Sequence, residues 1–308
     1  MKKAKSFLGY SKLDAETTAF AIDHREQIDV STPHPLPGPN DPLYYNLLAP
    51  TLWPNPSVLP RFRPVFEEYT QRMGEISMFF TQLISESLGM GPKAFDRFFD
   101  VGQQHKLKIV KYPDLAELGY PEGKEGQGVG PHKDSMLSSY LLQASPHRGL
   151  QVQNSKGEWV DCPPIDGTVV VAIGQGMEAL TRGVCRSTTH RVLSPERGKG
   201  ARYSIPFFQG VSYDATFESM DVPEEVLQLR KEIAAKEGAR LDDVEFTFKT
   251  GKYKHLGEAT LMNRIKSHPD VGERWYPEQL KAIREEQRRE REEKEARGEV
   301  YKANNSAY

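Results

Sequence analysis

The sequence predicts a mainly β fold with flanking helices, and three features of its 308 residues indicate it. The start is rich in proline, a long amphipathic segment follows, and apolar side chains then alternate with a period of two over about 100 residues. Many short strands without helices between them are typical of a β-sandwich or jelly roll. A sandwich or jelly roll is therefore the expected core.

The first 100 residues are expected to form a proline-rich loop and one helix. Nine prolines between residues 33 and 60 break any helical pattern there. Over 61–88, apolar residues recur at spacings of three and four, which predicts one helix face packed on a sheet. Gly89 and Gly91 follow, as expected past the end of a helix. The predicted apolar face consists of Phe66, Tyr69, Met73, Ile76, Phe80 and Leu83.

Seven or more short strands are predicted in the central region, separated by glycine, proline, asparagine or serine. Their ranges are 107–112, 136–142, 149–153, 158–160, 168–173, 186–193 and 202–208. Helical character returns near 223–237, and the segment 277–297 is highly charged, with Glu and Arg or Lys alternating at helical spacings. This last segment is expected to be a solvated single helix; a binding arm is the alternative.

Composition and charge exclude several classes of protein. Lys and Arg number 41 against 43 Asp and Glu, so the net charge of −2 argues against a nucleic-acid binder that relies on bulk positive charge. The mean hydropathy is −0.62, and no apolar run is long enough for a membrane span or a signal peptide. Cys162 and Cys185 lack metal-type pairing and indicate free thiols in a reducing compartment. We therefore expect a cytoplasmic protein.

One candidate metal site stands out among the eight histidines. Residues i and i+2 of a strand share a face, so the imidazole of His132 and the carboxylate of Asp134 can point toward one position. His190, in another predicted strand, can supply a third ligand. Two histidines and one carboxylate, with other positions open, are typical of non-haem Fe(II) oxygenases. Zinc enzymes with such ligands usually carry the helical pattern His-Glu-x-x-His, which is absent here.

An anion-binding group follows on the next predicted strand. Arg202 and Ser204 have the same parity and therefore face the same side. An inward-facing arginine needs an anionic partner, because burying it unpaired would cost several kcal/mol. A dicarboxylate bound to the metal at one end would supply that partner, with Ser204 donating a further hydrogen bond. The alternative is an ion pair with a carboxylate of the protein.

The stretch from Leu107 to Gln209 resembles the Fe(II)/2-oxoglutarate-dependent dioxygenases of the isopenicillin-N-synthase-like group, and the likeness extends over residues 1–276. A C-terminal motif that begins at Asn263 and ends at Val271 is similar to one in fungal and bacterial members. The other matching motifs are Lys111-Tyr-Pro113, Gly130-Pro-His-Lys-Asp134, Gly149-Leu-Gln-Val152, Gly157-Glu-Trp-Val160, Ile173-Gly174, Leu180-Thr-Arg-Gly183, His190-Arg-Val192 and Arg202-Tyr-Ser204.

The resemblance implies a distorted double-stranded β-helix, or jelly roll, in which His132, Asp134 and His190 hold Fe(II). It implies that Arg202 and Ser204 bind the distal carboxylate of 2-oxoglutarate and that Tyr112 helps to hold that carboxylate or the substrate. It also implies O2-dependent hydroxylation, desaturation or ring closure at an unactivated C–H, with release of succinate and CO2. No catalytic side chain beyond the metal ligands is expected.

The domain organisation and the start of the chain follow from the same resemblance. We expect an oxygenase domain over 1–276, with a proline-rich loop and helical part (1–100), a jelly-roll core (101–213) and a C-terminal cap (214–276), and then a charged helical tail (277–308). Family members normally carry about 80 residues before a segment like 2–10, so the N-terminal edge strands are expected to be missing. Either the gene model is truncated or the protein tolerates an open sheet edge that risks association, and a monomer is expected.

Two alternative functions remain open. A related Fe(II) oxidase that does not use 2-oxoglutarate keeps the same Arg-x-Ser pair, and a truncated, inactive homologue would also keep the motifs.

The substrate is expected to be a small, specialised metabolite. Lys108 shares parity with Tyr112, so if Tyr112 faces the cavity, Lys108 can face it too and could bind a carboxylate or phosphate of the substrate. The alternative is that strand twist turns Lys108 to solvent at the sheet end, where its stem covers apolar surface. Phe207 and the aromatic loop with Tyr44, Tyr45 and Trp53 are expected to make the pocket partly apolar.

Overall fold

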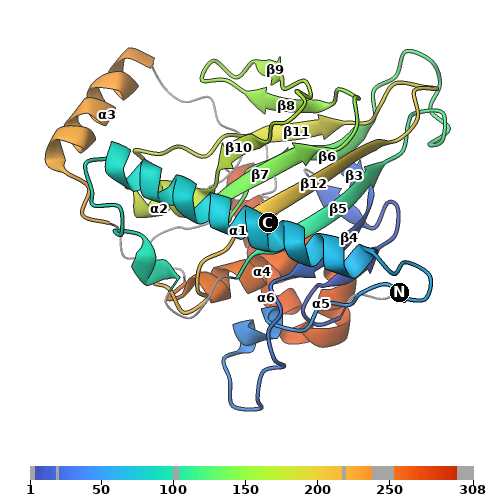
Figure 1. The fold of residues 1–308 in the computed structure, drawn as a ribbon, viewed down its shortest axis with the longest axis horizontal. Helices are drawn as coiled ribbons and strands as arrows, with labels where there is room; N and C mark the ends of the chain where they lie inside the picture. Colours follow the sequence, from blue (N-terminus) through green and yellow to red (C-terminus); the bar gives the residue numbers. More distant parts are fainter. Residues whose placement is uncertain (1–3, 19–20, 100–103, 217–219, 238–252, 297–308) are drawn as a thin grey trace.

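Two antiparallel sheets face each other in the computed structural model, which describes residues 4–18, 21–99, 104–216, 220–237 and 253–296 (Figure 1). The major sheet has the strand order β1-β4-β5-β12-β7-β10 and the minor sheet the order β6-β11-β8-β9. The major-sheet strands are β1 (Gly9–Ser11), β4 (Glu26–Ser31), β5 (Lys106–Tyr112), β12 (Arg202–Gln209), β7 (Ser138–Gln143) and β10 (Val170–Ile173). The minor-sheet strands are β6 (Gln127–His132), β11 (His190–Leu193), β8 (Leu150–Gln153) and β9 (Trp159–Asp161). This arrangement confirms the predicted jelly-roll class.

The N-terminal part contributes strands that the proline count did not predict. β4 pairs with β5 over six residues, and β1 pairs with β4, so the major sheet continues two strands past β5. A separate hairpin consists of β2 (Glu16–Thr18) and β3 (Ala21–Asp23). These strands lie at the end of the segment 2–10 or after it, so the expected absence of the edge strands that family members carry before it stays a prediction. β1 to β3 were not predicted because each has only three residues. The prolines begin only at Pro33, so they gave no reason to exclude strands before that position.

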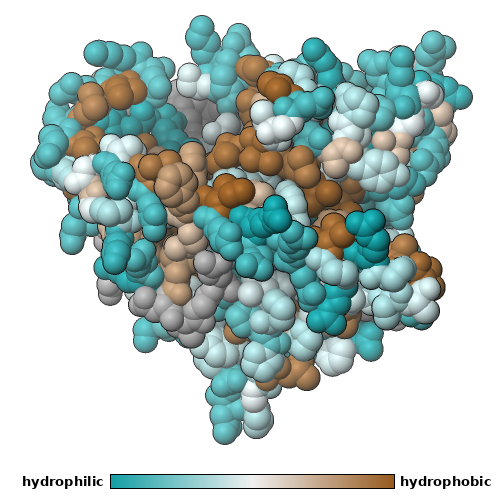
Figure 2. Space-filling model, in the orientation of Figure 1, coloured by the Kyte–Doolittle hydropathy of each residue, from teal (hydrophilic) through white to brown (hydrophobic). Residues whose placement is uncertain are grey.

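One long helix, α1 (Phe62–Ser87), crosses the outer face of the major sheet (Figure 1). The predicted apolar face is partly wrong, because Ile76 and Leu83 are 51% and 43% exposed. Small and polar residues face the sheet instead, and the hydroxyl of Thr81 donates a hydrogen bond to Gln209 of β12. Polar and apolar side chains consequently mingle on this face of the molecule (Figure 2). Short side chains let the helix approach the sheet closely, which rotates the apolar stripe partly toward solvent.

C-terminal helices close the end of the molecule near the N-terminal strands. Tyr44 of η1 (Leu43–Leu47) packs with them in one apolar cluster. Leu280 and Ile283 are also buried in that cluster, so the charged segment is anchored at its start and solvated only beyond it. None of the described helices is long and apolar enough to cross a membrane. The helices are α4 (Leu256–Ser267), α5 (Pro269–Trp275) and α6 (Pro277–Ala296).

Further short elements complete the described fold. They are η2 (Asp96–Phe98), α2 (Gln175–Leu180) and α3 (Glu224–Glu237). Leu227 of α3 packs with Met177 of α2 and Phe98 of η2 in a second apolar cluster beside the sheets.

Candidate active site

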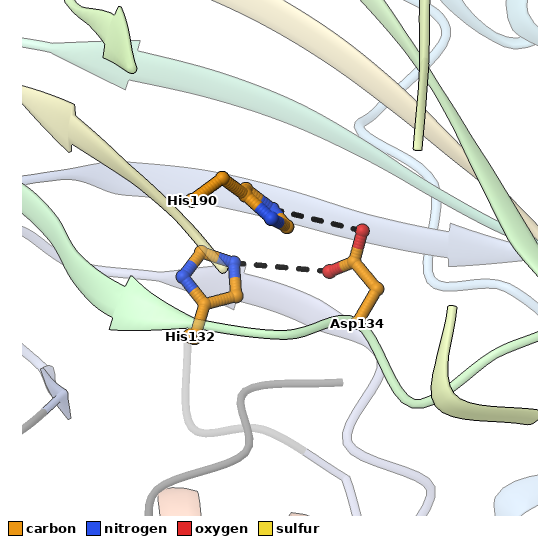
Figure 3. A group of neighbouring side chains, drawn as sticks. All are labelled: His132, Asp134 and His190. Carbon is orange, nitrogen blue, oxygen red and sulfur yellow. Dashed lines mark ion pairs between the residues drawn. The ribbon is translucent and has the colours of Figure 1, made fainter. Parts of the chain in front are cut away.

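The ends of two neighbouring minor-sheet strands bring His132, Asp134 and His190 together (Figure 3). His132 is the last residue of β6 and lies opposite His190, the first residue of β11. Asp134 lies just past the end of β6, so the strand parity argument holds only approximately for it. The distance from His132 Nε2 to Asp134 Oδ1 is 3.7 Å, and that from His190 Nε2 to Asp134 Oδ2 is also 3.7 Å. All three side chains are buried and offer ligand atoms within 4.8 Å of one another.

Backbone carbonyls fix the orientation of both imidazole rings. His132 Nδ1 lies 2.8 Å from the carbonyl oxygen of Gly130, and His190 Nδ1 lies 3.0 Å from that of Thr188. A carbonyl only accepts, so each Nδ1 carries the proton and each Nε2 keeps its lone pair free for a metal. Burial, followed by the neighbouring His190, also holds the pKa of His132 well below its usual value. Both rings thus direct Nε2 toward Asp134, in the tautomer that metal binding requires.

Tight glycine packing shapes this part of the site. A Cβ on Gly130 would lie 2.9 Å from the carbonyl oxygen of Thr18, and one on Gly174 would lie 1.9 Å from that of Met136. The amide of Gln175 also donates a 2.8 Å hydrogen bond to the carbonyl of Asp134. The loop that carries Asp134 is therefore held at the start of α2. The glycines explain why 127–132 was not predicted as a strand, because glycine and proline have low strand propensity.

Arg202 is buried beside the three ligands with part of its hydrogen-bonding capacity unused. It is 1% exposed, and its Nη2 donates a 3.0 Å hydrogen bond to Gln143. Its Nε and Nη1 find no hydrogen-bond partner among the residues that the structure describes. The guanidinium carbon lies 5.2 Å from the ring centre of Tyr112. Burial lowers the pKa of Arg202, but a guanidinium stays charged in proteins, so an anion is needed to offset its desolvation.

A cavity between the sheets joins the ligands to the predicted 2-oxoglutarate residues. Ser204 and Tyr112 line it, and the Ser204 hydroxyl donates a 3.2 Å hydrogen bond to the carbonyl of Leu142. The lining is mostly apolar between its charged ends. Its residues are Arg25, Lys108, Val110, Tyr112, Val129, His132, Asp134, Leu141, Leu150, His190, Val192, Arg202, Ser204, Pro206 and Phe208.

The two predicted substrate residues have different outcomes. Lys108 lines the cavity and is 2% exposed, so the solvent-facing alternative is wrong. Phe207 is fully buried on the opposite face of β12, where it packs with Leu107 and Tyr140 beneath α1, and it cannot reach the cavity. Phe208 lines the cavity instead. The parity that places Arg202 on the inner face already selects residue 208, so the signal for Phe208 was present in the sequence.

The aromatic loop also lies away from the cavity. The hydroxyls of Tyr44 and Tyr45 both donate to the carboxylate of Asp214. The ring of Trp53 packs at 6.3 Å from that of Phe62 at the start of α1. These aromatics fasten the N-terminal loop to its neighbours, and the apolar wall of the cavity comes from the strands instead.

Comparison with known proteins gives one consistent family. The family model described as the 2OG-Fe(II) oxygenase superfamily matches residues 104–211. The 2-oxoglutarate-dependent dioxygenase frbJ of Dothideomycetidae sp. (strain 11243) is 72% identical over 288 residues, which are 93% of this chain and 77% of that protein. A 2-oxoglutarate-dependent dioxygenase of Gibberella zeae is 36% identical over 296 residues, 92% of this chain and 76% of that protein.

A solved structure gives the same fold. A full-length Neurospora crassa protein, crystallised in complex with alpha-KG, has a TM-score of 0.62 and 22% identity, covering 87% of this chain and 75% of that one. Together with the buried His-Asp-His cluster, the curated relatives and the family model show an enzyme that uses Fe(II) and 2-oxoglutarate. The chain belongs to the 2OG-Fe(II) oxygenase superfamily.

Proposed function

We propose that His132, Asp134 and His190 are the protein ligands of Fe(II), and that Arg202 and Ser204 bind the distal carboxylate of 2-oxoglutarate. The observation that carries the proposal is the buried Arg202, whose Nε and Nη1 lack partners among the described residues and which lines the same cavity as the three ligands. The carboxylate oxygen Asp134 Oδ2 likewise has no hydrogen-bond partner in the described structure. These atoms of Arg202 and Asp134 are therefore suited to bind 2-oxoglutarate and Fe(II), respectively.

The bound iron supplies the oxidising chemistry, in which O2 and 2-oxoglutarate are consumed, succinate and CO2 are released and a C–H bond of the substrate is oxidised. The chain itself binds, orients and excludes water. Arg202 fixes one end of 2-oxoglutarate by charge-assisted hydrogen bonds, and Tyr112, packed against its guanidinium, keeps that group in place. Apolar side chains such as Val110, Leu141 and Leu150 leave little room for water beside the reacting atoms.

The proposed outcome is hydroxylation, desaturation or ring closure of a small, specialised metabolite by a monomer in the cytoplasm. The small, largely apolar cavity between the sheets supports a small-molecule substrate, and the fungal relatives support oxidation by this reaction class. The free thiols of Cys162 and Cys185 suit a reducing compartment.

Succinate formation from 2-oxoglutarate tests this function. The purified protein with Fe(II), O2 and a panel of metabolites should release succinate, and His190→Ala should release none. Substrate oxidation without succinate would indicate the related oxidase that does not use 2-oxoglutarate. Absence of both Fe(II) binding and succinate would indicate an inactive homologue.

A further inference from the structure

The cavity has a second cationic end, formed by Lys108 and Arg25. Both side chains are buried, and both line the cavity that contains the iron ligands. Arg202 lies opposite Tyr112 in the β5–β12 register, whereas Lys108 is four residues further along β5. Four residues of a strand span roughly 13 Å along the backbone, so the two cationic residues come from well-separated positions along the cavity wall.

The acidic partners of these two cations lie behind them. Lys108 Nζ is 3.5 Å from Asp29 Oδ1, on the neighbouring strand β4. Arg25 Nη2 is 2.6 Å from Glu16 Oε2 and 3.3 Å from Asp23 Oδ2. None of these three carboxylates belongs to the cavity lining in the described structure. The wall that a substrate meets at this end is therefore positive, although the layer behind it is acidic.

A further layer of contacts holds the acids in place. His268 Nε2 lies 2.9 Å from Glu16 Oε1, and Arg264 Nη1 lies 4.0 Å from Asp29 Oδ1. Both residues come from the C-terminal helical region, at α4 and just past its end. The amide of Gln27 donates to Glu16 at 3.1 Å and to Asp29 at 2.9 Å. Lys108 and Arg25 are thus positioned by a rigid network, which lowers the entropy cost of binding an anion.

We propose that Lys108 and Arg25 bind a carboxylate of the primary substrate, so that the enzyme oxidises a carboxylic acid whose reacting carbon faces the iron site. This inference rests on the proposed function, because it assumes that 2-oxoglutarate occupies the Arg202 end. In the buried network, Arg25, Lys108 and Arg264 face Glu16, Asp23 and Asp29. The three acids already balance these three cations, so one additional negative charge fits better than the two of a phosphate.

The chemistry of the network agrees with this choice. Burial raises the pKa of Asp23 and lowers that of Lys108 well below its usual value. A carboxylate beside Lys108 would favour the ammonium form and compensate its desolvation. The mixed lining suits such a molecule, because the apolar strands can hold its hydrocarbon part.

Anaerobic titration tests the inference with the enzyme loaded with Fe(II). The visible absorption of the Fe(II)–2-oxoglutarate complex reports co-substrate binding, and its change on adding a probe reports substrate binding without turnover. The probes are aliphatic and aromatic monocarboxylic acids and L-amino acids, each paired with its carboxamide. Acids should perturb the absorption and their carboxamides should not.

Substitutions assign the effect to the cationic end. Lys108→Met should weaken binding of the best acid by about 30-fold, the loss expected for one charge-assisted hydrogen bond. Lys111→Met is the matched control, because Lys111 lies on the same strand but pairs with Glu26 and Glu117 outside the cavity. If Lys108→Met does not fold, the double variant Lys108→Met/Asp29→Asn removes the ion pair as a unit.

The outcomes separate the two proposals. Equal binding of acid and carboxamide, no response to any acid, or unchanged acid binding by the Lys108 variants would overturn the inference. Failure of the wild-type protein to form the Fe(II)–2-oxoglutarate absorption would instead overturn the proposed function.

Discussion

Two clusters of buried polar side chains, one beside Arg202 and Asp134 and one around Lys108 and Arg25, differ in whether their polar atoms have partners. At the iron end, Arg202 Nε and Nη1 and Asp134 Oδ2 have no hydrogen-bond partner among the described residues. In the other cluster, the single carboxylate of Glu16 contacts both Arg25, at 2.6 Å, and His268, at 2.9 Å. Both clusters are equally hidden from solvent.

Polar atoms without a partner indicate a ligand-binding role, whereas acids with several partners indicate a structural role. A buried polar atom without a partner costs free energy, so a ligand must recover that cost in the working enzyme. A buried ion pair with several additional hydrogen bonds is already compensated, and breaking it leaves an uncompensated charge. We therefore expect substitutions at the iron end to change activity, and substitutions of the acids behind Lys108 and Arg25 to change stability.

The iron ligands should show the largest effect. Asp134→Ala, like His132→Ala or His190→Ala, should lower Fe(II)-dependent succinate formation by at least about 10³-fold, because metal-dependent chemistry needs the bound ion. The melting temperature of the metal-free variant should stay near that of the wild type. The exposed Asp166 in the turn before β10 offers the control Asp166→Ala, which should keep full activity. Retained iron affinity and activity in His190→Ala would show that the iron ligands are wrongly assigned.

Substitution of Glu16 should lower the stability of the protein, in contrast to substitution of the iron ligands. Glu16→Ala removes the carboxylate that Arg25 and His268 share and leaves Arg25 the longer contact with Asp23, so the free energy of unfolding should fall by about 3–5 kcal/mol. Urea denaturation measures it. Glu68→Ala, which breaks an exposed pair with Arg72 on α1, should cost less than about 1 kcal/mol. A stable Glu16 variant would break the proposed contrast between the two clusters.

Substitution of Arg202 should separate 2-oxoglutarate binding from iron binding at the iron end. Arg202→Gln should raise the apparent KM for 2-oxoglutarate roughly 30- to 1000-fold, equivalent to about 2–4 kcal/mol, with little change in iron affinity. Arg191→Gln is the control, because its guanidinium lies over the Trp159 ring and outside the cavity lining. An unchanged KM in the Arg202 variant would favour the oxidase that does not use 2-oxoglutarate.

His105 should behave as part of the fold, with the smallest effect. Burial lowers its pKa to about 4, and its Nδ1 accepts a 3.3 Å hydrogen bond from the amide of Gly210. Below about pH 6.5 the unfolded chain binds a proton that the folded protein refuses until about pH 4, so stability falls as the pH is lowered through this window. The loss from this group is about 1.6 kcal/mol between pH 6.5 and 5. The free energy of unfolding of His105→Gln should therefore fall less than that of the wild type over this pH range. Equal pH dependence of the two proteins would show that His105 is not the cause.

Strand parity predicted the inner face of β12 and much of the site. Arg202 and Ser204 line the cavity as expected. The same alternation continues to residue 208, so it selects Phe208 over Phe207. The proposed iron ligands could be singled out because their residue types are chemically specific. Their positions depend on two strand ends that meet in space, which parity along one strand cannot describe.

The N-terminal network could not be predicted from local patterns. Glu16, Arg25 and Asp29 lie in or beside short polar strands that resemble a loop in sequence. They become buried only because β4 pairs with β5 and α4 packs nearby, contacts between segments far apart in the chain. Arg25 was missed for this reason, whereas Lys108 was found because β5 itself has a clear pattern.

A crystal structure of the enzyme grown without O2, with Fe(II) and 2-oxoglutarate, tests the iron-end assignment most directly. It should show iron held by His132, Asp134 and His190, and a 2-oxoglutarate carboxylate within hydrogen-bond distance of Arg202 Nε or Nη1. The Lys108 end should remain free of 2-oxoglutarate. Iron bound by other residues, or a 2-oxoglutarate carboxylate on Lys108 with Arg202 still without a partner, would contradict the assignment.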